Sequence, residues 1–89
     1  MEAVHLLIKG KVQGVFYRAS ARDKANELGI KGWVKNTRDG DVEIVASGQK
    51  ESLKNFIDWC HKGPRRAIVT GVTITVMETN NFQDFQILK

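Results

Sequence analysis

The segment that most constrains this chain is a glycine-containing turn, residues 10–18, set between a predicted strand and a predicted helix. Residue polarity alternates over residues 4–9, which predicts a strand, and the apolar residues of 19–28 recur at helical spacing. The turn between them contains Gly10 and Gly14. Such a turn directs several backbone N–H groups into one concavity, and the helix N-terminus adds partial positive charge. The segment therefore predicts an anion site.

Arg18 lies where this turn meets the helix. A cation is unfavourable at a helix N-terminus unless an anion lies beside it. The guanidinium group presents a planar fork of donors that fits phosphate oxygens, so we expect Arg18 to clamp a phosphate. The other donors would be the backbone N–H groups of Gln13, Gly14, Val15, Phe16 and Tyr17. The side chains of Phe16 and Tyr17 are expected to pack.

The rest of the chain continues as alternating strands and amphipathic helices. Strands are predicted over residues 4–9, 30–37, 41–47, 67–76 and 85–87, and helices over 19–28 and from Gln49 to Gly63-Pro64. Ser20 is expected to serve the start of the first helix. The order β-α-β-β-α-β plus a short last strand predicts an α+β, ferredoxin-like split β-α-β fold. Both helices should cover one face of an antiparallel sheet, and residues 1–89 should form a single domain.

This topology brings two distant segments together. Strands one and two run parallel with strand three between them, so their C-terminal ends lie at one edge of the sheet, about 10 Å apart. Arg18 follows the first strand and Asn36 lies near the end of the second. On residue type alone, Asn36 is better explained as a polar residue before a hairpin turn at Arg38-Asp39-Gly40 than as a functional group.

The amino-acid composition limits the kinds of molecule that the protein can be expected to bind. The net charge is +4, and the basic residues are dispersed, which favours a small anion over a nucleic acid. Hydrophobic residues make up 42% and charged residues 27%, which argues against disorder. Cys60 is the only cysteine, and no signal segment or membrane-spanning apolar run is visible, so we expect a soluble cytoplasmic protein without membrane contact. We also expect a monomer.

The residues that could ligate a metal are scattered. His5 and His61 lie on different predicted elements, and neither has a second ligand at metal spacing. Cys60 falls on the apolar stripe of its helix and is expected in the core. Asp39 and Asp41 flank a hairpin glycine, so turn chemistry explains them. We therefore expect no metal and no cofactor.

Two stretches resemble the signatures of the acylphosphatase family. They are Gly10-Lys11-Val12-Gln13-Gly14-Val15-Phe16-Tyr17-Arg18 and Gly32-Trp33-Val34-Lys35-Asn36-Thr37-Arg38-Asp39-Gly40-Asp41-Val42 with Gly48 after it. The resemblance spans nearly the whole chain. It implies hydrolysis of the carboxyl–phosphate bond of a small acyl phosphate to a carboxylate and inorganic phosphate. It also implies that Arg18 binds the phosphate and that Asn36 is a catalytic residue, whose uncharged amide would orient a water.

Two other functions stay open at this level. A binding module for RNA or for a phosphorylated metabolite would keep the basic turn but would not depend on Asn36. The chain lacks the aromatic ladder of an RNA-recognition motif, because Trp33 stands alone, and we expect no nucleic-acid partner. A domain of a hydrogenase-maturation carbamoyltransferase is the other alternative, and it is disfavoured because the chain fits closely around one predicted domain.

Overall fold

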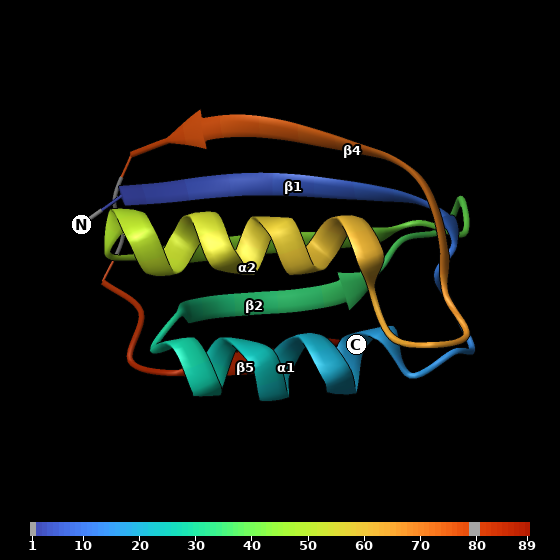
Figure 1. The fold of residues 1–89 in the computed structure, drawn as a ribbon, viewed down its shortest axis with the longest axis horizontal. Coiled ribbons are helices and arrows are strands. Elements are labelled where there is room, and N and C mark those ends of the chain that lie inside the picture. The colour runs from blue at the N-terminus through green and yellow to red at the C-terminus, as the bar shows by residue number, and fades with distance from the viewer. Residues whose placement is uncertain (1, 79–80) are drawn as a thin grey trace.

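The computed structural model describes residues 2–78 and 81–89 (Figure 1). The elements follow in the order β1 (Glu2–Lys11), α1 (Tyr17–Leu28), β2 (Lys31–Asn36), β3 (Val42–Gly48), α2 (Lys50–Lys62), β4 (Ile68–Met77) and β5 (Phe85–Ile87). The five strands form one sheet in the order β4-β1-β3-β2-β5. This confirms the predicted ferredoxin-like order of elements, with β1 in the interior of the sheet and β3 between β1 and β2.

The predicted sheet was antiparallel throughout, and here the structure corrects the prediction. β1, β2, β3 and β4 pair antiparallel, but β5 runs parallel to β2. The reason lies in where β4 ends. The last residues of β4 pair with the first residues of β1, which lie at the same edge of the sheet as the first residues of β2. The chain therefore enters β5 at that edge, and β5 runs in the same direction as β2. The Gly32 N–H donates to the carbonyl of Asp84 over 2.9 Å and joins the two strands at this point.

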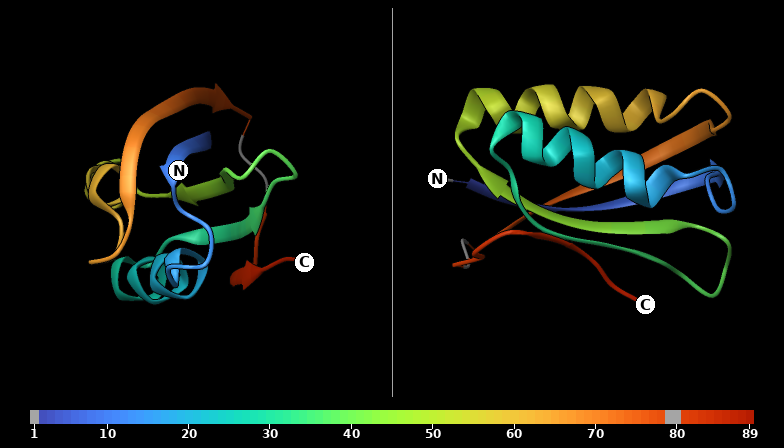
Figure 2. Two further views of the ribbon diagram at one scale, coloured as in Figure 1. Left: turned by 90° about the vertical axis from the view of Figure 1, so that its right-hand side faces the viewer. Right: turned by 90° about the horizontal axis from the view of Figure 1, so that it is seen from below.

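Both helices cover the same face of the sheet, as predicted (Figure 2). The core between the two layers is apolar because every second residue of β1 and β3 points toward the helices. Helix α1 contributes Ala21 and Ala25, and α2 contributes Leu53, Phe56 and Cys60. The strand residues of the core include Val4, Leu6, Ile8, Val34, Val42, Ile44 and Ala46. Within the described residues, neither helix is long and apolar enough to cross a membrane.

The start of α1 differs from the prediction. The helix begins at Tyr17, two residues before the expected position, and Ser20 is not its cap. The capping position belongs to Phe16, whose backbone is left-handed with φ 64° and whose side chain makes no capping hydrogen bond. The Ser20 N–H donates instead to the Phe16 carbonyl over 3.0 Å, which is already the first helical hydrogen bond. The predicted stop at Gly29 is confirmed, with φ 72°.

Candidate active site

One pocket lies where the loop after β1, the start of α1, the end of β2 and the end of β5 meet. The loop after β1, the start of α1 and the end of β2 lie toward the right in Figure 1. The pocket, here called the site pocket, has a volume of about 320 Å³. Its lining residues are Val12, Gly14, Phe16, Tyr17, Arg18, Ala19, Asn36 and Ile87. The structure thus brings Arg18 and Asn36 to one cavity, as the strand order predicted, whereas Gln13 and Val15 do not line it.

Arg18 lies in the first turn of α1 and is partly buried. That turn contains no acidic residue, and no carboxylate among residues 2–78 and 81–89 forms a salt bridge with Arg18. The guanidinium charge therefore adds to the positive end of the helix dipole without a compensating anion from the described protein. This arrangement favours binding of an anion in the site pocket.

The loop between β1 and α1 leaves its backbone donors free. The first backbone hydrogen bond of this region comes from Ser20, so the N–H groups of residues 13–19 have no backbone acceptor in the part of the chain described. Gly14 has φ 74° and Phe16 has φ 64°, two left-handed positions that bend the loop tightly. Left-handed residues in such loops make concave arrangements of N–H groups that bind anions. Gly14 thus adopts a backbone conformation that glycine favours.

Gln13 has a role that sequence reasoning missed. Its side-chain amide donates two hydrogen bonds of 2.8 Å, one to the carbonyl of Thr37 and one to the carbonyl of Asp41. Both acceptors belong to the hairpin between β2 and β3, so Gln13 ties the loop that precedes Arg18 to the strand that ends at Asn36. Nothing in the residue pattern identified this bridge, because an amide finds such partners only through the tertiary fold.

The two aromatic residues of the loop behave differently. Tyr17 packs as predicted: it is buried, its hydroxyl donates to the Cys60 carbonyl over 2.7 Å, and burial raises the pKa of the phenol. The centroid of its ring lies 5.4 Å from the centroid of the Trp59 ring. The prediction that Phe16 packs is wrong, because its left-handed backbone leaves the side chain 74% exposed at the site pocket. Val15, between Gly14 and Phe16, is buried in the core.

Asn36 ends β2, and its backbone pairs with Val42. The side-chain Oδ1 atom is buried and has no hydrogen-bond partner among the described residues. A buried acceptor without a partner costs about 1–3 kcal/mol, so such groups in folded proteins usually meet a water or a ligand. Asn36 lines the same pocket as Arg18, which places its side-chain amide beside a molecule bound there.

The two histidines and the cysteine lie away from the site pocket. His5 contacts Glu43 at 2.7 Å on neighbouring strands, and His61 contacts its own helix through the Ile57 carbonyl. No three potential metal ligands cluster anywhere in the described residues. Cys60 is buried, and burial raises the pKa of its thiol to about 12.

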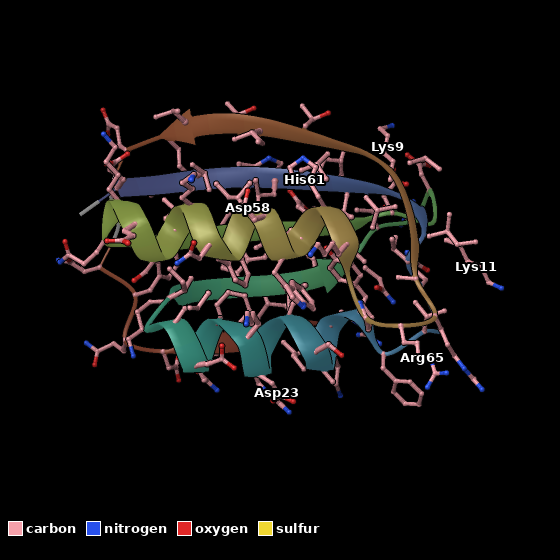
Figure 3. The ribbon with its side chains drawn as sticks, in the orientation of Figure 1. Lys9, Lys11, Asp23, Asp58, His61 and Arg65 are labelled. Atoms are coloured by element: carbon pink, nitrogen blue, oxygen red, sulfur yellow. The ribbon has the colours of Figure 1, made fainter. Side chains whose placement is uncertain are left out.

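Figure 3 shows Lys11 and Arg65 projecting from the end of the molecule that holds the site pocket, where they favour the approach of anions.

Comparison with known proteins identifies what the chain is similar to. A family model described as Acylphosphatase matches residues 4–87. The acylphosphatase of Marinobacter nauticus is 54% identical over 83 residues, which cover 92% of this chain and 90% of the relative. That of Methylococcus capsulatus is 50% identical over 90 residues, covering 100% of this chain and 98% of the relative. The structure of an acylphosphatase from Coxiella burnetii superposes with a TM-score of 0.94 and 41% identity, covering 98% of this chain and 92% of that one.

Proposed function

Because this chain belongs to the acylphosphatase family, we propose that the site pocket is where it hydrolyses the carboxyl–phosphate bond of acyl phosphates. The enzyme releases a carboxylate and inorganic phosphate. The observation that carries the assignment of the site is that Arg18, Asn36 and the loop with free N–H donors all line one cavity.

In this proposal the loop and Arg18 hold the phosphoryl group. Phosphoryl transfer needs mainly positioning and stabilisation of charge on the phosphoryl oxygens. The N–H groups of Gln13, Gly14, Val15, Phe16 and Tyr17 supply fixed dipoles, and the guanidinium group of Arg18 supplies a bidentate charge. Donors that are already oriented act most strongly on the charge that develops in the transition state. The loop is therefore a phosphate-binding loop.

Asn36 acts on the attacking water. Its Oδ1 accepts a hydrogen bond from the water, and this contact supplies the partner that the buried oxygen otherwise lacks. An amide does this without becoming charged, so it directs the lone pair of the water toward phosphorus. A covalent mechanism through Cys60 is disfavoured, because this buried thiol does not line the pocket and its raised pKa of about 12 keeps it protonated.

The substrate is a small molecule, and the product is inorganic phosphate. The dispersed charge of the chain supports a protein that binds no nucleic acid. We propose that the protein works as a monomer. The single cysteine supports a cytoplasmic location, where thiols stay reduced. The proposed mechanism uses only protein groups, substrate and water, and we therefore propose that the enzyme needs no cofactor.

The test compares Arg18→Lys with Arg22→Lys in hydrolysis of acetyl phosphate. Both changes keep a positive charge on α1, one helical turn apart, but only Arg18 lines the pocket. A lysine cannot reproduce the bidentate fork, so we expect kcat/KM of Arg18→Lys to fall by about 10²-fold or more. Arg22→Lys should match the wild type. Near-normal kcat/KM for Arg18→Lys would contradict the proposed phosphate clamp.

A further inference from the structure

Gln13 belongs to the loop that precedes Arg18, yet its side chain does not line the site pocket. The side chain reaches the hairpin between β2 and β3 instead. Its amide nitrogen donates there to the carbonyl of Thr37 and to the carbonyl of Asp41, each over 2.8 Å. A side-chain amide has two N–H donors, and both are used by these contacts. The Gln13 side chain therefore has no donor left for a ligand and acts on the protein.

The two acceptor carbonyls are held in place by the hairpin itself. The Thr37 N–H donates to the Asp41 carbonyl over 2.9 Å, and the Asp41 N–H donates to the Thr37 hydroxyl over 3.1 Å. The Gly40 N–H donates to the Thr37 carbonyl over 3.4 Å. Thr37 directly follows Asn36, the last residue of β2. The Gln13 amide is thus bonded to the residue next to Asn36.

The loop and the end of β2 are otherwise anchored separately. Tyr17 is held at the start of α1 by the hydrogen bond of its hydroxyl to α2, and Asn36 is held by the pairing of β2 with β3. Among the hydrogen bonds within the described residues, only the two from Gln13 join the loop, residues 12–16, to the hairpin, residues 37–41. This pair of bonds sets the position of one half of the site relative to the other.

We propose that Gln13 is a positioning residue, whose side chain holds the phosphate-binding loop and Asn36 at the separation that attack by water requires. This inference rests on the proposed function of the site pocket. Hydrolysis needs the water beside Asn36 to face the phosphorus held beside Arg18, and a misplacement of about 1 Å costs about 10²-fold in rate. Phosphate binding uses only the loop and Arg18. Loss of the Gln13 contacts should therefore lower turnover and leave phosphate affinity nearly unchanged.

The first measurement compares Gln13→Met with Gln83→Met. Methionine is similar in length to glutamine but has no hydrogen-bond donor, and Gln83 is exposed and does not line the site pocket. We expect kcat on acetyl phosphate to fall by about 10²-fold in Gln13→Met, while the calorimetric affinity for inorganic phosphate stays within about threefold of the wild type. Gln83→Met should keep both values. Equal losses of kcat and phosphate affinity in Gln13→Met would contradict the positioning role.

A double-mutant cycle separates positioning from a general effect on the loop. If Gln13 acts through Asn36, its removal costs nothing further once the Asn36 amide is gone. Gln13→Met should then leave kcat unchanged in the Asn36→Ala background, although it lowers kcat in the wild-type background. A residue that only stabilises the loop would lower kcat by the same factor in both backgrounds. Independent losses of this kind would overturn the proposal.

Gln13→Glu keeps the test decisive if Gln13→Met fails to fold. Glutamate preserves the length and polarity of the side chain but removes both N–H donors. A role in packing or solvation predicts wild-type kcat for this variant, whereas positioning predicts a loss of about 10²-fold or more. Wild-type kcat in Gln13→Glu would overturn the positioning role, while hydrolysis of acetyl phosphate would leave the proposed function standing. If the wild type does not hydrolyse acetyl phosphate, the proposed function fails and this inference with it.

Discussion

Gly14 has a backbone conformation on which the proposed phosphate-binding loop depends. Its φ of 74° lies in the left-handed region, yet a Cβ atom added there would meet nothing within 4 Å. Any substitution therefore acts through backbone conformation and not through collision with a neighbour. The loop would have to change its path to accommodate a β-branched residue, and the N–H donors on either side of position 14 would lose their common direction.

We predict that Gly14→Val folds but binds inorganic phosphate at least tenfold more weakly, because the N–H donors of the loop lose their common direction. A tenfold loss of affinity corresponds to about 1.4 kcal/mol of binding free energy. Titration calorimetry with phosphate measures the affinity, and circular dichroism checks the fold. Gly71→Val in β4 is the control, since its added Cβ also meets nothing within 4 Å and its φ is not in the left-handed range. Wild-type phosphate affinity in Gly14→Val would mean that the loop does not depend on this glycine.

At the scale of elements, the buried hydroxyl of Tyr17 links α1 to α2. It donates to the carbonyl of Cys60, a buried acceptor near the end of α2. The same tyrosine lies one residue before Arg18, so the contact also fixes the first turn of α1 against the helix layer.

We predict that Tyr17→Phe destabilises the protein by about 1–3 kcal/mol, because the change leaves the Cys60 carbonyl buried without its donor. For a domain of this size, each 1 kcal/mol lowers the melting temperature by about 4–8 °C. Thermal melting followed by circular dichroism measures the shift. An unchanged melting temperature would show that water replaces the hydroxyl at this position.

The elements themselves were largely predictable from the sequence, because their signals are local. Alternation in β1 and β3 identified the core face at Leu6 and Ile44, and Gly29 marked the end of α1. The juxtaposition of Arg18 and Asn36 followed from strand order alone. Their roles came from the resemblance to a family, since an asparagine before a hairpin is an ordinary residue.

What the sequence did not predict depends on tertiary geometry. The direction of β5 is set by the position of the last residues of β4, which lie at the same edge of the sheet as the start of β2. The bridge from Gln13 to the hairpin and the exposure of Phe16 depend on a loop path that no periodicity encodes. In β4, Ile74 and Val76 alternate like core residues and pair with the core strand β1, but they remain exposed at the edge of the sheet.

At the scale of the whole molecule, Glu43 is a carboxyl group through which pH should affect the stability of the fold. The hydrogen bond from His5 is the main cause that lowers the pKa of this carboxyl group, and Lys35, at 3.6 Å, adds to it. A carboxyl whose pKa is lower in the folded than in the unfolded protein stabilises the fold above its unfolded pKa. This contribution is lost as the pH falls through the folded pKa.

We therefore predict that Glu43→Gln melts below the wild type at pH 7, and that the difference shrinks as the solution is made acidic and disappears below the lowered pKa of Glu43. Thermal melting of both proteins from pH 7 downward measures this convergence. A gap in melting temperature that stays constant with pH would mean that Glu43 stabilises the fold through packing and not through its charge.

We propose above that Asn36 directs water in the pocket where Arg18 and the loop hold phosphate. Asn36→Ala tests it, with Asn26→Ala on the exposed part of α1 as control. The change removes a buried oxygen that has no partner in the described protein, so the melting temperature should not fall. The decisive measurement is paired: the phosphate affinity by calorimetry and kcat on acetyl phosphate, for the same preparation of each variant.

We predict that Asn36→Ala binds phosphate almost as the wild type does, because Arg18 and the loop donors remain. Its kcat should fall by ~10²–10³-fold, or about 3–4 kcal/mol, since the water loses the group that orients it. Asn26→Ala should keep both values. If phosphate affinity and kcat of Asn36→Ala fall together, Asn36 holds the phosphate instead; if kcat is unchanged, Asn36 does not act on the attacking water and the account is contradicted.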